Sequence, residues 1–129
     1  MTGLEIAAFY SGILVILLVV LAFVVTLNRR RTLVSLGTGA DEKLEQAVRA
    51  HANAIENAVP GIGALILLAL VNAPVLALHI LGGGLVAGRL LHAQGLLSAP
   101  GRSFGRLVGT LLSWLALLGM GGLLIISAF

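Results

Sequence analysis

Cysteine is absent from the 129 residues, so the chain can form no disulfide and can supply no thiolate of its own. Any thiol that takes part in the function must therefore arrive with a ligand. Charged side chains are also scarce, at 10% of residues against about 25% in soluble domains. A small chain has much surface for its volume, so this one is short of groups that can face water. The composition argues against a soluble domain.

Apolar residues make up 59% of the chain, and they gather in four long runs. The predicted spans cover about 4–27, 45–71, 75–97 and 103–127, and each can cross the roughly 30 Å of a bilayer's hydrocarbon core. The first run has no positively charged segment before it and is too long for a signal-peptide core, so we expect it to stay in the mature protein. The predicted fold class is all-α: one integral membrane four-helix domain over residues 1–129.

Polar segments divide the runs. Asn28–Arg31 is predicted to end the first helix abruptly, and Asp41 to begin the second, within which Pro60 predicts a kink. Asn72–Pro74 predicts a tight turn, and Arg102 is predicted to open the fourth helix.

The basic residues sit at the ends of the apolar runs, although the net charge of +3 could suggest nucleic acid. They do not form a stripe along one face, so we predict no nucleic-acid partner. Lys and Arg fall in the first and third connections, while the second connection and both termini have none. By the positive-inside rule, both termini face the outer side of the membrane.

Several ionisable residues lie inside or at the edge of the spans, in the half that this topology makes cytoplasmic. Arg49, Asn53 and Glu56 share one face of the second helix, and Arg89 and His92 share one side of the third. We expect these groups to converge, because a charge in the bilayer costs about 2.5–3.5 kcal/mol on insertion scales.

Two interpretations of this convergence remain open. Glu56 can simply neutralise Arg89 or Arg49 and hold two helices together. The arginines outnumber that carboxylate, however, and surplus guanidinium groups are what a site for an anionic ligand needs. Three scattered histidines have no recognisable metal-ligand spacing, so we predict no metal site.

The pattern Arg49-x-x-x-Asn53-x-x-Glu56, followed by Pro60, resembles the signature of the MAPEG family, the membrane-associated proteins in eicosanoid and glutathione metabolism. Gly88-Arg89-Leu-Leu-His92 and Ala99-Pro100-Gly-Arg102-Ser103 are further matches. The resemblance covers essentially the whole chain and is closest to the family's short bacterial branch. It implies a multi-pass protein of the bacterial inner membrane.

The resemblance also implies a homotrimer that binds glutathione, as a co-substrate, between neighbouring subunits near the cytoplasmic side. The tripeptide would be held by a set of matching positions, which are Arg49, Asn53, Glu56, Arg89, His92, one of Arg29–Arg31 (Arg30 is our choice), and His51 from the adjacent subunit. Arg102 lines up with the arginine that stabilises the glutathione thiolate in catalytic members, and Ser103 could donate a hydrogen bond to sulfur.

Three functions compete. The first is a glutathione-dependent transferase or peroxidase acting on a lipophilic electrophile dissolved in the membrane. The second is a non-catalytic lipid- or glutathione-binding protein of the same fold. It is favoured by the lack of tyrosines that catalytic eicosanoid enzymes carry, where this chain has Leu96, Phe104 and Arg106. The third is a structural bundle or small transporter subunit, which the lack of an evident inverted repeat disfavours.

Overall fold

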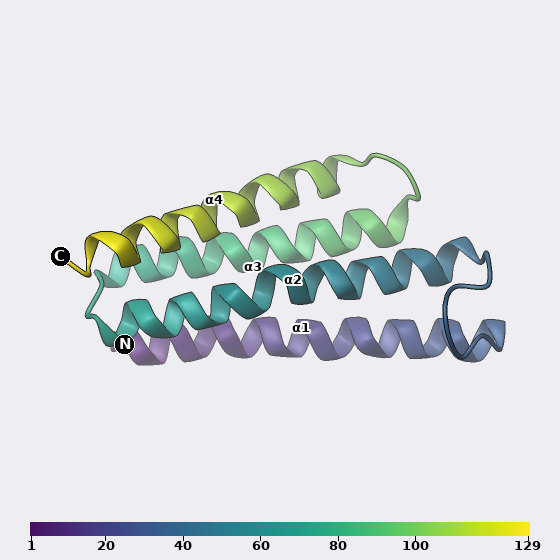
Figure 1. Ribbon diagram of the computed structural model, residues 1–129, viewed down its shortest axis with the longest axis horizontal. Helices are drawn as coiled ribbons and strands as arrows, with labels where there is room; N and C mark the ends of the chain where they lie inside the picture. Colours follow the sequence, from purple (N-terminus) through teal and green to yellow (C-terminus); the bar gives the residue numbers. More distant parts are fainter.

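The computed structural model describes all 129 residues, as four helices and no strand: α1 (Gly3–Thr32), α2 (Glu42–Leu70), α3 (Val75–Ser98) and α4 (Phe104–Ile126). The helices run up and down, so both termini lie at one end of the bundle, and the α1–α2 and α3–α4 connections lie at the other (Figure 1). Each helix contains a window with a mean hydropathy between 1.5 and 2.9, and each is long enough to span a membrane. The predicted all-α membrane bundle is confirmed.

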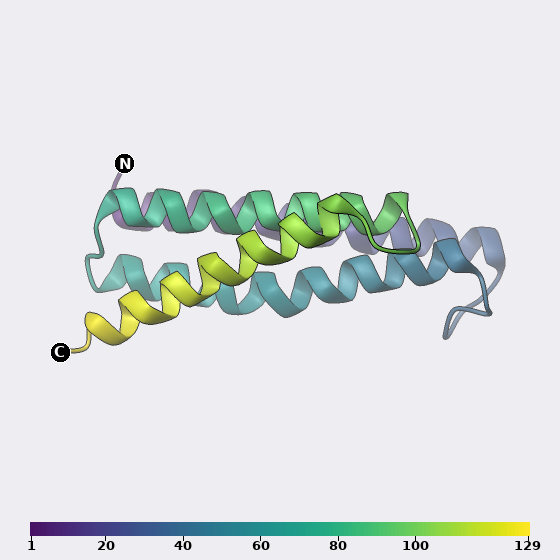
Figure 2. The ribbon, with the colours of Figure 1, turned by 90° about the horizontal axis from the view of Figure 1, so that it is seen from above.

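The helices do not form a symmetric square. α1 packs on α2 and α3, and α4 packs on α2 and α3, while α1 and α4 do not touch. Figure 2 shows α4 crossing obliquely to the other helices, whereas α1 and α3 run nearly parallel. α2 and α3 are therefore the central pair, and α1 and α4 each leave a broad face uncovered.

The uncovered face of α1 is apolar. Ile16, Val19 and Phe23 are each more than 60% exposed. Water would penalise an apolar surface of this extent, and hydrocarbon does not. The outward-facing side chains thus support the membrane assignment that hydropathy had suggested.

The interior has two apolar clusters with polar side chains between them. The larger cluster occupies the end near the termini and contains Leu65, Leu85 and Met120 among its twelve residues. The smaller one, at the loop end, contains Leu21, Ala54 and three others. Four polar residues are buried in the bundle, and these are Asn57, Arg89, His92 and Ser113.

Two helix boundaries differ from the prediction. α1 does not end at Asn28 but continues through the three arginines to Thr32, and Leu33 then adopts a left-handed conformation with φ 56°. Basic residues in the last turn interact favourably with the negative end of the helix dipole, so they stabilise the end of this helix rather than terminate it. Pro60 lies inside α2 and does not end that helix.

The second difference concerns α4, which begins at Phe104 and not at Arg102. Ser103 is its N-cap, with the hydroxyl accepting a hydrogen bond from the backbone N–H of Arg106 at 3.3 Å. Serine is among the best N-cap residues because its oxygen satisfies an N–H that lacks a partner inside the helix. Arg102 therefore lies just outside the helix.

Glycines let α3 and α4 approach closely at their loop ends. A Cβ on Gly95 would lie 2.6 Å from the backbone N of Arg106, and one on Gly109 would lie 2.5 Å from the backbone N of His92. Both distances are shorter than any side chain could tolerate, so only glycine permits this packing. The contact fixes the first turn of α4 against α3.

Candidate functional site

Arg89 is the most deeply placed charge in the molecule, with 1% of its surface exposed. Its Nε donates to Ser113 Oγ at 2.7 Å, and its Nη1 donates to Asn53 Oδ1, also at 2.7 Å. Its Nη2 donates to the carbonyl of Gly109 at 3.2 Å. A single guanidinium thus joins α2, α3 and α4 through neutral acceptors.

The first of the two interpretations, an ion pair between Glu56 and Arg89 or Arg49, does not form within the chain. The chain contains one salt bridge, between Arg31 and Asp41, and Glu56 and Arg49 are both exposed on α2. Asn53 lies between them in the sequence but turns toward α3, so its amide takes the place of the expected carboxylate. An amide oxygen satisfies a guanidinium without the cost of burying a second charge.

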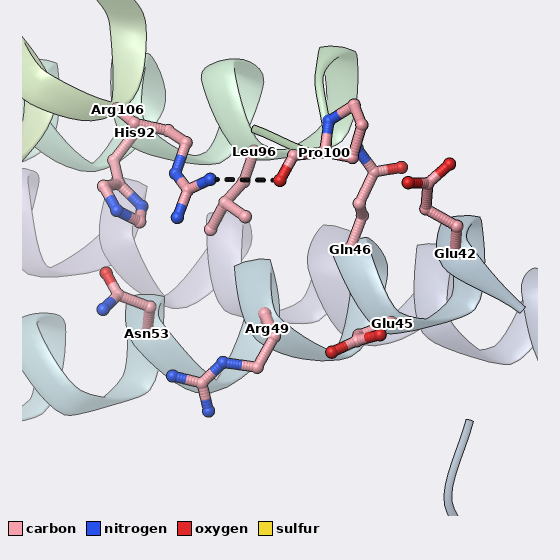
Figure 3. A pocket seen from close by; sticks show the side chains of 9 residues that line it. All are labelled: Glu42, Glu45, Gln46, Arg49, Asn53, His92, Leu96, Pro100 and Arg106. Carbon is pink, nitrogen blue, oxygen red and sulfur yellow. Dashed lines mark hydrogen bonds between the residues drawn. The ribbon is translucent and has the colours of Figure 1, made fainter. Parts of the chain in front are cut away.

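The first pocket, which we call the polar pocket, opens between α2, α3 and the α3–α4 connection and has a volume of about 300 Å³. Figure 3 shows His92 and Asn53 pointing toward one another across it, with Arg106 above and Arg49 below. Its walls carry both signs of charge, and its lining residues are Glu42, Glu45, Gln46, Arg49, Asn53, His92, Leu96, Pro100 and Arg106.

The second pocket, which we call the α4 pocket, lies beside the first turns of α4 and has a volume of about 770 Å³. It is basic at one end and apolar at the other, where it reaches Trp114. Its lining residues are His92, Arg102, Ser103, Phe104, Arg106, Leu107, Thr110, Leu111 and Trp114. A further apolar hollow continues from Trp114 along α4 to Ile125. His92 and Arg106 line both pockets, so the two meet at these side chains.

The structure brings together only some of the predicted site residues. Arg49, Asn53 and His92 line the polar pocket, while Arg102, Ser103 and His92 line the α4 pocket. Arg89 lies behind the site and holds Asn53 in place. Four predicted residues line neither pocket of their own chain, and these are Arg30, His51, Glu56 and Arg89.

The three arginines at the end of α1 have different surroundings. Arg29 donates to the carbonyls of Val34 and Gly37, and Arg31 pairs with Asp41 at 2.6 Å. This hydrogen bond from Arg31, followed by one from the backbone N–H of Leu44, lowers the pKa of Asp41 below its usual range. Arg30 is exposed and makes no hydrogen bond within the chain, so it alone of the three is free to reach another molecule.

Ser103 has a structural role in this arrangement. Its hydroxyl donates to the carbonyl of Gly95 at 3.0 Å and accepts from the backbone of Arg106. A serine hydroxyl has one proton to donate. Because that proton is used on Gly95, the side chain caps α4 and ties it to α3.

Sequence reasoning missed Arg106 as a site residue, together with Glu42 and Glu45. The two glutamates could have been found, because they extend the Arg49–Asn53 face of α2 by one and two turns at helical spacing. Arg106 could not, since only the crossing of α4 over α3 brings it to the pockets. No group of three His, Cys, Asp or Glu side chains lies close enough together to hold a metal ion.

Comparison with known proteins agrees with the architecture. The MAPEG family model matches residues 7–126, and the chain belongs to this family, which includes glutathione-dependent transferases. The Inner membrane protein YecN of Escherichia coli is 32% identical over 90 residues, which cover 70% of this chain and 69% of that protein. No solved structure matches the chain. The protein is a multi-pass integral protein of the inner membrane.

Proposed function

We propose that this protein binds glutathione in the polar pocket and conjugates it, through its sulfur, to a lipophilic electrophile that enters through the α4 pocket. The observation that carries the proposal is that a charged pocket meets, at His92 and Arg106, a second pocket whose far end is apolar. Both volumes fall in the range of about 300–1,000 Å³ that is usual for small-molecule sites. A water-soluble thiol and a membrane-dissolved partner would each find a pocket suited to its polarity.

The charges of the polar pocket suit a zwitterionic ligand. Glu42 and Glu45 provide two carboxylates, while Arg49 and Arg106 provide two guanidiniums. Glutathione carries two carboxylates and one ammonium group. Arg49 can bind a carboxylate through paired hydrogen bonds, and a glutamate can accept from the ammonium. Arg106 stays at the junction with the α4 pocket. Since Glu56 lies outside the pocket of its own chain, we assign the ammonium to Glu42 and Glu45 instead.

A homotrimer would explain the exposed charges on α2. About 20 residues cross the hydrocarbon core, so counting back from Leu70 places its inner edge near His51. Glu56 lies between His51 and Leu70 and is therefore within the hydrocarbon core. Its side chain is exposed there and has no partner in its own chain. A closed ring of identical subunits would cover it with a different patch of a neighbour. Arg30 and His51 would then be available to the site of an adjacent subunit.

Glutathione binding and conjugation can be measured separately on the purified protein in detergent. We expect saturable binding by calorimetry, and turnover of 1-chloro-2,4-dinitrobenzene followed by absorbance. Arg49→Leu should weaken binding at least tenfold. Lys43→Leu is the matched control, because it removes a nearby positive charge that lines neither pocket. Equal affinities for the two variants would contradict the assignment of the pocket.

A non-catalytic binding protein of the same fold is the second candidate. It is favoured by Leu96 and Phe104, which stand where catalytic relatives in the family are expected to carry tyrosine hydroxyls. Such a protein would bind glutathione or a lipid with no turnover of any electrophile. Binding without conjugation at every pH tested would select this alternative.

A further inference from the structure

Arg106 occupies the junction of the two pockets, while Arg102 does not. Arg106 lines both the polar pocket and the α4 pocket. Arg102 lines the α4 pocket alone, is exposed, and makes no hydrogen bond. A group that promotes reaction between a ligand in one pocket and a ligand in the other must reach the point where they meet. Of the two arginines, only Arg106 is placed there.

The backbone of Arg106 is held firmly. Its N–H donates to the Ser103 cap, and Gly95 of α3 packs directly against it. Its Nη1 donates to the carbonyl of Gly101 at 2.6 Å, and Figure 3 shows the side chain extended along the pocket toward Pro100. Its Nε and Nη2 make no hydrogen bond within the protein. The guanidinium is therefore fixed on one side and keeps free donors on the other.

The place of Arg106 in α4 is electrostatically unfavourable for the helix itself. Arg106 lies in the first turn of α4, where the helix dipole is positive, and that turn contains no acidic residue. A cation at this end of a helix is destabilising by about 0.3–1 kcal/mol. A bound anion would be attracted to both the guanidinium and the helix N-terminus. The pockets beside it give such an anion a place to bind.

We propose that Arg106, and not Arg102, contacts the sulfur of bound glutathione and stabilises it as the thiolate. This assignment rests on the proposed function. The thiol proton passes to solvent, and the sulfur then uses an electron pair to bond to the electrophilic carbon. With a chlorinated aromatic substrate the C–Cl bond breaks and chloride leaves with its electron pair. Arg106 balances the negative charge on sulfur until the new bond forms, and Arg102 flanks the entrance of the electrophile.

The test is to titrate the thiol of bound glutathione by its ultraviolet thiolate absorbance in four proteins: wild type, Arg106→Leu, Arg106→Lys and Arg102→Leu. A cysteine thiol has a pKa of about 8.5 when free, and a neighbouring cation lowers it by about 1–3 units. We expect Arg106→Leu to raise the bound thiol pKa by about 1–2 units and to slow conjugation at pH 7 at least tenfold. Arg106→Lys should recover much of the lowered pKa, because it restores the charge.

The same titration separates a structural role from a direct one. Arg106 also braces the α3–α4 connection, so calorimetric affinity and oligomer size are measured for each variant. Lysine has no guanidinium to repeat the hydrogen bond to Gly101. If the bound thiol pKa in Arg106→Lys is nevertheless lower than in Arg106→Leu, the positive charge and not the bracing is responsible. A wild-type pKa in Arg106→Leu, or a raised pKa in Arg102→Leu alone, would overturn the assignment and leave the proposed function standing. Absence of glutathione binding by the wild type would overturn both.

Discussion

The hydrogen bonds of Arg89 make an asymmetric prediction about stability. Removing the Asn53 side chain takes the short Nη1 acceptor from a buried charge, whereas removing Arg89 itself leaves only neutral groups. Asn53→Ala should therefore destabilise the bundle more than Arg89→Met does. Methionine fills much of the volume of arginine and has no hydrogen bonds to satisfy.

The size of the effect follows from the contacts. Asn53 Oδ1 accepts from the guanidinium at 2.7 Å, where Arg89 is buried and Asn53 is half-buried beside the polar pocket. A hydrogen bond to a charged group contributes about 1.5–3 kcal/mol in proteins, while couplings measured in membrane bundles average about 0.6 and reach about 1.7 kcal/mol. We expect Asn53→Ala to cost about 2 kcal/mol, of which about 1.5 is coupling to Arg89.

A double-mutant cycle measures that coupling. The four proteins are wild type, Asn53→Ala, Arg89→Met and the double variant, and their unfolding is followed by circular dichroism during titration with SDS at one protein concentration. Asn57→Ala is the matched control, because the side chain of Asn57 donates only to the backbone carbonyl of Asn53. If Asn53→Ala costs the same with and without Arg89, the guanidinium does not depend on the amide and the reasoning fails.

Three other predictions concern topology, assembly and the α1–α2 connection. A reporter fused at Phe129 should be active only on the outer side of the membrane, and a cytoplasmic signal would reverse the orientation. Native mass spectrometry should give a trimer for wild type and less of it for Glu56→Ala, because that variant loses the proposed contact with a neighbour; a monomeric wild type would refute this. Because the folded-state pKa of Asp41 is lowered, its contribution should be present above the unfolded pKa of about 4 and be lost as pH falls through the lower folded value. The protection factor of the Leu44 amide against hydrogen exchange should accordingly be high and independent of pH near neutrality. Asp41→Ala should lower this protection factor, and an unchanged value would exclude the cap.

The sequence contained enough to predict the architecture. Hydropathy gave four spans, and turn residues such as Asn72 and Pro74 gave the connections, because both properties depend on local composition. The Arg49–Asn53–Glu56 spacing indicated the family, and two residues of that face, Arg49 and Asn53, line the polar pocket. Local rules failed at the helix ends. Arg29–Arg31 predict a stop, although a helix can carry basic residues through its last turn into the interface.

What the sequence determined by itself is the number of spans, the helical class and the family, since these depend on the order and polarity of neighbouring residues. Only the tertiary structure decided the partners of the charged groups. It paired Arg89 with an amide rather than with Glu56, and it brought Arg106 rather than Arg102 to the junction of the pockets. The first outcome depends on the packing of α2 against α3. The second depends on the crossing of α4 against α3, which close packing at Gly95 and Gly109 fixes. Such contacts join residues far apart in the chain, so no local pattern could have specified them.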